Sequence, residues 1–188
     1  IKGEIVMLKF AFIFDVGSPV GDDHQKVYEN AESYNLIKGI GNLENAEALV
    51  KKLVDEEGYE LLNFCGAFEQ EMLDSYRKAV DKSIKMAVVD YLPEEAEKFE
   101  KLKVVEEYGI IIVMRGVTEM TKVELKGEGL NAYAYFVKDL DMAKEAAKKL
   151  VADGIHFIEL CSWFDREKTE AIIDAIDGKV PVGTAGTL

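Results

Sequence analysis

The residues of this chain best suited to chemistry are Glu159 and Cys161, which lie two positions apart at the end of a short apolar segment. Side chains alternate between the two faces of an extended strand, so this spacing places both groups on one face. A carboxylate inside an apolar strand is costly unless it is paired or solvated, so Glu159 requires a partner or a cavity. Cys161 precedes a helix expected to begin near Asp165, whose free N–H groups lower the pKa of a nearby thiol. The pair therefore predicts a ligand pocket, or a site for nucleophilic or acid–base catalysis.

A matching pair lies earlier in the chain, where Asn63 and Cys65 occupy the corresponding positions. Because the amide of Asn63 replaces the carboxylate of Glu159, we expect one functional copy or two unlike half-sites. The candidate ligand pocket consists of Glu159, Cys161, Trp163, Asn63 and Cys65, with Glu159 as polar anchor and Trp163 as an aromatic wall. The alternatives are that the cysteines are small hydrophobic residues of a duplicated core and that Glu159 forms an ion pair with a lysine at the end of the sheet.

The two pairs correspond because the chain contains a tandem duplication. Identical residues recur at a nearly constant offset between the first half and the second. They are Leu43 and Leu140, Ala46 and Ala143, Lys51 and Lys148, Lys52 and Lys149, Leu53 and Leu150, Val54 and Val151, Gly58 and Gly154, Cys65 and Cys161, Phe68 and Phe164, Glu71 and Glu167, Ala79 and Ala175, and Asp81 and Asp177. Duplicated units usually pack about a pseudo-twofold axis, as the protomers of an isologous dimer do.

Hydrophobic patterning predicts the same elements in both copies. Continuous apolar runs indicate first strands buried on both faces, and helical spacing with N-caps at Asn42 and Asp139 indicates helices that end at Gly58 and Gly154. The expected strands are 10–14, 34–40, 59–65 and 84–89 in the first copy and 110–114, 132–137, 155–161 and 180–183 in the second, with second helices at 69–81 and 165–176. This β-β-α-β-α-β order predicts the α/β class, with two tandem repeats whose mostly parallel sheets are covered by helices and related by a pseudo-twofold axis.

We expect a first repeat at 1–90, a connecting helix within 91–106 and a second repeat at 107–188. Pro93 suits the first turn of that connecting helix. The connections between the first two strands are long and differ between the copies: 17–33 is a polar loop, whereas 116–131 contains a segment at 122–125 that could form an extra strand. Long loops of this kind are typical of binding or partner surfaces. Whether the repeats share one sheet stays open.

Other motifs give weaker signals. His156 opens a strand on the face opposite Glu159, and His24 lies in a polar loop, so neither has the setting of a base or a metal ligand. The sequence Gly39-Ile-Gly41-Asn42 lies where a phosphate-binding turn would lie, but a tight turn is the better interpretation because the second copy lacks both glycines. No catalytic triad, Walker motif, dinucleotide fingerprint or zinc spacing is present. We therefore expect no cofactor and no metal.

The composition limits the class of partner. The formal net charge is −13 and the pI is near 4.7, which argues against nucleic acid and against anionic membrane surfaces as partners. No apolar run is long enough to span a membrane, and the N-terminus does not resemble a signal peptide. Two cysteines in apolar strands predict reduced, buried thiols and a cytoplasmic location.

The second copy resembles a family of small prokaryotic α/β domains with the pattern E-L-C-G-x-F followed by V-P-V-G. The resemblance is based on Glu159-Leu160-Cys161, Phe164, Ala175-Ile176-Asp177-Gly178 and Val180-Pro181-Val182-Gly183. It implies a fused dimer of a domain with no assigned activity. Ser162 and Trp163 depart from the pattern, as do Asn63 and Lys85-Met86-Ala87 in the first copy.

Three functions are compatible with these residues. We expect a protein that binds a small molecule near the carboxyl ends of the strands. The alternatives are an enzyme that uses Cys161 or Glu159, and a non-catalytic assembly module that forms homo-oligomers.

Overall fold

The computed structural model describes residue 3 and residues 6–188, which form two packed α/β repeats. The first repeat has a five-stranded sheet in the order β2-β3-β1-β4-β5. Its strands are β1 (Leu8–Asp15), β2 (Gln25–Glu29), β3 (Ser33–Ile40), β4 (Leu61–Phe64) and β5 (Lys85–Val88), and its helices are α1 (Ala46–Lys51), continued by a π-helical turn at Lys52–Glu56, and α2 (Gln70–Ala79). All strand pairs are parallel except β2 with β3.

The second repeat has a six-stranded sheet in the order β6-β11-β10-β7-β9-β8. Its strands are β6 (Asp90–Tyr91), β7 (Glu107–Val113), β8 (Thr121–Leu125), β9 (Asn131–Val137), β10 (Phe157–Leu160) and β11 (Val182–Thr184), and its helices are α3 (Pro93–Glu100), α4 (Leu140–Ala152) and α5 (Arg166–Ala175). The edge strands β6 and β8 are antiparallel to their neighbours and the other pairs are parallel. The expected α/β class with two mostly parallel sheets is confirmed.

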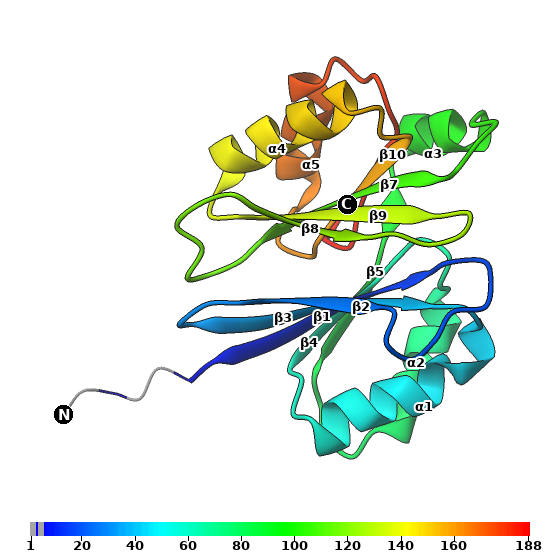
Figure 1. Cartoon of the computed structure of the whole chain (residues 1–188), viewed down its shortest axis with the longest axis vertical. Helices are drawn as coiled ribbons and strands as arrows, with labels where there is room; N and C mark the ends of the chain where they lie inside the picture. Colours follow the sequence, from blue (N-terminus) through cyan, green and yellow to red (C-terminus); the bar gives the residue numbers. More distant parts are fainter. Residues whose placement is uncertain (1–2, 4–5) are drawn as a thin grey trace.

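The two repeats form four layers in which the sheets face each other and the helices lie outside (Figure 1). The rings of Tyr28 and Phe136 stack across the interface with centroids 4.5 Å apart, and Phe14 meets Tyr108 edge to face at 5.6 Å. The repeats therefore do not share one sheet. Each sheet uses one face for its own helices and the other for the partner repeat.

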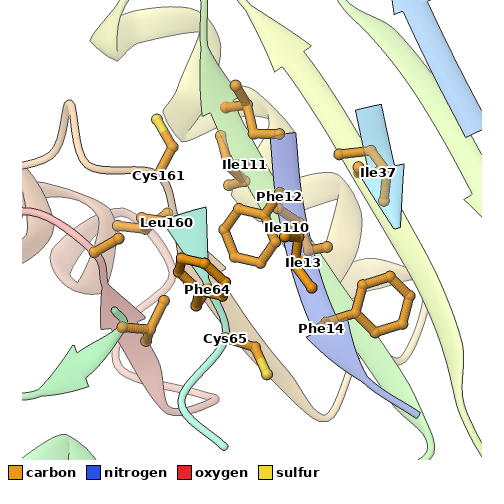
Figure 2. Close-up of a cluster of buried hydrophobic side chains, with 14 of the residues drawn as sticks. Phe12, Ile13, Phe14, Ile37, Phe64, Cys65, Ile110, Ile111, Leu160 and Cys161 are labelled. Carbon is orange, nitrogen blue, oxygen red and sulfur yellow. The ribbon is translucent and has the colours of Figure 1, made fainter. Parts of the chain in front are cut away.

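This arrangement explains the continuous apolar runs in the first strands. Phe12 and Ile13 have no exposed surface, although they point to opposite faces of β1. Figure 2 shows side chains of β1, β4, β7 and β10 meeting in one cluster, with Phe12, Phe64 and Ile110 close together. In a parallel strand that is buried on both faces, the side chains of both faces are apolar, so the sequence shows a continuous apolar run without alternation.

Helix ends follow the expected capping residues. Asn42 caps a 3₁₀-helical turn (Leu43–Asn45) that leads into α1, and its Oδ1 accepts a hydrogen bond from Glu44 N at 2.9 Å. Asp139 caps α4, and its Oδ1 accepts a hydrogen bond from Met142 N at 2.9 Å. Gly58 and Gly154 adopt φ values of 75° and 88°, a left-handed conformation that glycine reaches without strain. No helix in the described part of the chain is long and apolar enough to cross a membrane.

One segment of the first repeat differs from expectation. The polar loop expected at 17–33 contains strand β2, which pairs with β3 as β8 pairs with β9 in the second repeat. Four of the five β2 residues are exposed, so the strand lacks the apolar alternation that would have identified it. Both copies therefore have the order β-β-β-α-β-α-β.

Candidate functional site

Glu159 is buried between the two sheets and is hydrogen-bonded on both oxygens. The hydroxyl of Tyr91 donates to its Oε1 at 2.7 Å, and Gly66 N donates to the same oxygen at 3.1 Å. The hydroxyl of Tyr108 donates to its Oε2. The partners are two tyrosines of the second sheet, on β6 and β7, and a backbone amide that follows β4, so the carboxyl group joins the second repeat to the first.

Asn63 makes the reciprocal contact on the other side of the interface. Glu159 Oε1 accepts from the amide of Gly66 in the first repeat, and Asn63 Oδ1 accepts from the amide of Ser162 in the second repeat at 2.8 Å. The Asn63 amide also donates to Ser162 Oγ at 3.1 Å. Asn63 and Glu159 occupy equivalent positions, as do Gly66 and Ser162. This is the mutual pattern of an isologous interface, realised within one chain.

Burial determines the ionisation of this cluster. Glu159 is 2% exposed, and burial raises the pKa of its carboxyl group although the hydrogen bonds from Tyr108, Tyr91 and Gly66 oppose the shift. Burial and the adjacent Glu159 also raise the pKa of both tyrosine hydroxyls. Three hydrogen-bond donors surround a buried carboxyl group from which water is excluded. This arrangement indicates a structural role for Glu159 in joining the repeats.

Cys65 and Cys161 are both buried free thiols, and Figure 2 shows them on opposite sides of the apolar cluster. Burial raises the pKa of Cys161 to about 11, and it raises the pKa of Cys65 further, with Glu159 adding to the shift. The direction is opposite to the lowering expected from the helix after Cys161, because loss of solvent outweighs the backbone N–H groups.

We expect neither thiol to react with iodoacetamide in the native protein at pH 8, because each is buried and protonated. Peptide mass spectrometry after timed alkylation measures each site separately. Rapid modification of Cys161 in the folded chain, with Cys65 unmodified, would contradict this expectation and support a nucleophilic role.

Trp163 lies apart from the buried cluster. Its side chain is 40% exposed, and the ammonium group of Lys168 lies 4.6 Å from the ring centroid. The structure therefore brings Glu159 and Asn63 together at the interface and leaves Trp163 at the surface.

A hollow of about 840 Å³ lies in the first repeat, between the outer face of β3 and helix α1. Its lining comes mainly from four segments: the outward-facing residues of β3, the turn after β3, the loop after β1 that bends toward the helix layer (Figure 1), and the stretch from Asn45 to Tyr59 that includes α1. The lining residues used below are Tyr34, Leu36, Lys38, Asn42, Asn45 and Tyr59. The hollow thus extends along β3 to its carboxyl end, and the carboxyl ends of the strands are where open parallel sheets bind ligands.

Gly41 allows the loop to close over this end of the hollow. A Cβ atom at Gly41 would lie 2.5 Å from Ser18 O and 2.9 Å from Pro19 Cα. Gly39, two residues earlier, is covered on the inner face by the ring of His24, which lies 2.4 Å from where its Cβ would be. The two glycines of this turn are thus required by close packing on both faces of the sheet.

Lys38 forms part of the floor of the hollow and is 7% exposed. Its Nζ donates to the carbonyl oxygen of Asp22. Burial lowers the pKa of its ammonium group, and the charge of Asp22 opposes the shift. Among the residues that the structure describes, no carboxylate oxygen lies within 4.0 Å of this Nζ. A buried ammonium group with no carboxylate in direct contact among these residues is therefore the electrostatic feature of this hollow.

The second repeat has a smaller hollow of about 310 Å³ in the equivalent place. Strand register equates Leu36 with Tyr133 and Lys38 with Tyr135, because Ile37 lies opposite Phe12 and Ala134 lies opposite the equivalent Ile110. Tyr133 lines the smaller hollow as Leu36 lines the larger one, and its side chain is bulkier than that of leucine. The duplicated fold therefore has one large hollow and one reduced copy.

Lys38 and the tyrosines of this hollow are not among the site residues predicted from the sequence. The sequence contains an indication of Lys38, because this charged residue lies inside an otherwise buried strand, as Glu159 does. Gly39 and Ile40 end strand β3, Gly41 and Asn42 follow it, and all four residues line the hollow. His24 and His156 lie outside the hollow, and no cluster of three or more potential metal ligands occurs in the described part of the chain.

Comparison with known proteins gives a family and no activity. A family model described as "Family of unknown function (DUF6506)" matches the chain twice, over residues 8–104 and 106–187. No curated protein matches the chain. A solved structure described as an NtrC family transcriptional regulator from Clostridium acetobutylicum is similar with a TM-score of 0.32 and 14% sequence identity, and the match covers 97% of this chain and 89% of that chain.

Proposed function

The chain belongs to the DUF6506 family of unknown function in two tandem copies, and from its own geometry we propose that it binds a small organic molecule in the hollow between β3 and α1. The supporting observation is the contrast between the repeats: the same place holds about 840 Å³ in one copy and about 310 Å³ in the other. The larger volume lies within the range typical of small-molecule sites. Because only the first repeat retains the larger volume, we infer that this volume serves to bind a ligand.

The hollow also has the composition of a binding site. Tyr34, Leu36 and Tyr59 supply apolar surface, and Lys38, Asn42 and Asn45 supply a few convergent polar groups. Lys9 fixes the two tyrosine rings, since its Nζ lies 5.5 Å and 5.3 Å from their centroids and donates to Glu57 O at 2.7 Å. A pre-formed pocket of this kind binds without first having to order its walls.

We assign the buried Glu159 cluster to a different role, which is to hold the repeats together. Its carboxyl oxygens are engaged by Tyr91, Tyr108 and Gly66. We place the protein in the cytoplasm, because reduced, buried thiols suit that compartment.

Closing the hollow tests the proposal. Leu36→Tyr introduces the residue that the second repeat has at the equivalent position, so the fold should accept it while the hollow fills. The measurement is a two-dimensional NMR screen of neutral and anionic fragments against the wild type. We expect bound fragments to shift amide signals along β3 and α1 and to lose this effect in Leu36→Tyr.

The matched control is Tyr133→Leu in the second repeat, which should leave fragment binding at the first hollow unchanged. The proposal is overturned if no fragment shifts signals of the hollow, or if fragments that do so bind Leu36→Tyr as tightly as the wild type. Thermal unfolding of each variant verifies that the fold is retained.

A further inference from the structure

Building on the proposed function, we propose that the molecule bound in this hollow carries a carboxylate that pairs with the ammonium group of Lys38.

Burial of the ammonium group is the first step. Lys38 is 7% exposed, and its Nζ has one hydrogen-bond acceptor, Asp22 O, within the described part of the chain. An ammonium group has three N–H donors, so two remain for a ligand. Burying a cation without an opposite charge is unfavourable, and an anion in the hollow would remove that cost. Burial is the main cause that lowers the pKa of Lys38, and the charges of Asp22, Asp23 and Glu57 only oppose it. A carboxylate in direct contact would therefore stabilise the charged form further.

The groups around Lys38 suit the rest of such a ligand. Asn42 and Asn45 contribute side-chain amides to the lining, and Tyr34 and Tyr59 contribute aromatic surface at an interplanar angle of 70°. Because Lys9 occupies one side of the tyrosine pair, the rings have a fixed orientation. A carboxylate attached to a flat apolar body would place its charge at Lys38 and its body along these side chains.

Acidic residues in the lining limit the charge of the ligand. Asp22 and Glu57 both border the hollow, and Glu57 already pairs with Lys52 at 3.5 Å. A second negative charge on the ligand would face these carboxylates without a further buried cation to balance it. This balance favours a carboxylate monoanion over a phosphate dianion.

The second repeat provides an internal comparison. Tyr135 takes the place of Lys38, and Lys122 on the neighbouring strand lies 6.0 Å from its ring centroid. Lys122 pairs with Glu124 at 2.9 Å, so its charge is balanced within the protein. Lys122 of the small hollow and Lys52 of the large hollow each have a carboxylate partner, whereas Lys38 of the large hollow has none within 4.0 Å in the described part of the chain.

The test uses benzoate, its neutral analogue benzamide, and inorganic phosphate as probes at constant ionic strength. Lysine labelled with ¹³C at Cε reports each ammonium group by NMR, and Lys38→Met assigns the signal of interest. We expect benzoate to shift the Lys38 signal saturably. Lys38→Met should weaken benzoate binding roughly 10- to 100-fold, which corresponds to the loss of about 1.5–3 kcal/mol for hydrogen bonds to a charged group.

Matched variants separate charge from folding. Lys122→Met in the second repeat should leave benzoate affinity unchanged, and Lys38→Arg should retain a large part of it because the charge remains. Both variants and Lys38→Met are compared by thermal unfolding, so that a loss of binding in a folded protein is attributed to the missing ammonium group.

The outcomes distinguish this inference from the proposed function. If benzamide binds the hollow as tightly as benzoate, the carboxylate inference is overturned and small-molecule binding stands. If phosphate binds the hollow more tightly than benzoate, the ligand is a phosphate and the carboxylate assignment is overturned. If none of the probes shifts the Lys38 signal while neutral fragments bind the hollow, the carboxylate inference is overturned and the proposed small-molecule binding stands. If neither the probes nor the fragments bind the hollow, both the inference and the proposed function are overturned.

Discussion

Glu159→Ala is expected to destabilise the folded protein by about 3–5 kcal/mol, because each buried donor left without an acceptor costs about 1–3 kcal/mol. Three donors lose their acceptor: the hydroxyl groups of Tyr91 and Tyr108 and the amide of Gly66. The cavity left by the side chain adds to the loss. Urea unfolding followed by the fluorescence of Trp163, the single tryptophan of the chain, measures the free energy of unfolding.

Glu159→Gln is the matched control and gives a pH signature. Burial raises the folded-state pKa of Glu159 above its unfolded value, so the folded state holds this proton more tightly. The stability contributed by protonated Glu159 is fully present below the unfolded-state pKa and is lost as pH rises through the folded-state pKa. Glutamine has nearly the same side-chain shape as glutamate but cannot ionise. The Glu159→Gln variant should therefore lack the part of the stability loss at rising pH that Glu159 causes.

The difference in unfolding free energy between the wild type and Glu159→Gln should therefore shift in favour of the variant from about pH 5 to pH 8. Taking the difference cancels the titration of the many other acidic residues. A difference that stays constant across this range would show that Glu159 has the same proton affinity in the folded and unfolded states. If Glu159→Ala lowered the free energy of unfolding only as much as a substitution of an exposed residue does, the hydrogen bonds of Glu159 would not stabilise the interface between the repeats.

The fold was largely predictable because its signals are local and occur twice. The paired glycines at Gly58 and Gly154 and the caps at Asn42 and Asp139 marked the same helix in both copies. Strand β2 was missed because it is an exposed edge strand without apolar alternation. That the sheets would pack face to face is a long-range property, and a pattern of local periodicity contains no information on it.

The candidate site was predictable only in part. The cost of a buried charge indicated that Glu159 needs a partner, but the partners are tyrosines 68 and 51 residues away in the sequence, so their identity depends on the tertiary fold. The same reasoning, applied to Lys38 within its buried strand, would have identified the floor of the hollow. The hollow itself is formed by residues far apart in the sequence, and the two repeats differ at two equivalent strand positions, with Leu36 and Lys38 in the first and Tyr133 and Tyr135 in the second.

Phe12→Ala is expected to destabilise the protein by about 3–5 kcal/mol, the usual cost of removing a buried phenylalanine side chain. Phe12 has no exposed surface and lies on the inner face of β1, in register with Asn63 of β4. The cluster around it draws side chains from both sheets (Figure 2). The inner face of each sheet is covered by the other repeat, so the two repeats should unfold in a single transition.

Trp163 makes this cooperativity measurable, because Phe12 belongs to the first repeat and Trp163 to the second. We expect the urea midpoint of Phe12→Ala to fall equally by Trp163 fluorescence and by far-ultraviolet circular dichroism. Val104→Ala, at a residue that is 46% exposed, should leave both midpoints in place. If Phe12→Ala instead gives two transitions, with the Trp163 midpoint unchanged, the second repeat is stable without the inner face of the first. The Asn63–Ser162 and Glu159–Gly66 contacts would then join two independent domains rather than the halves of one core.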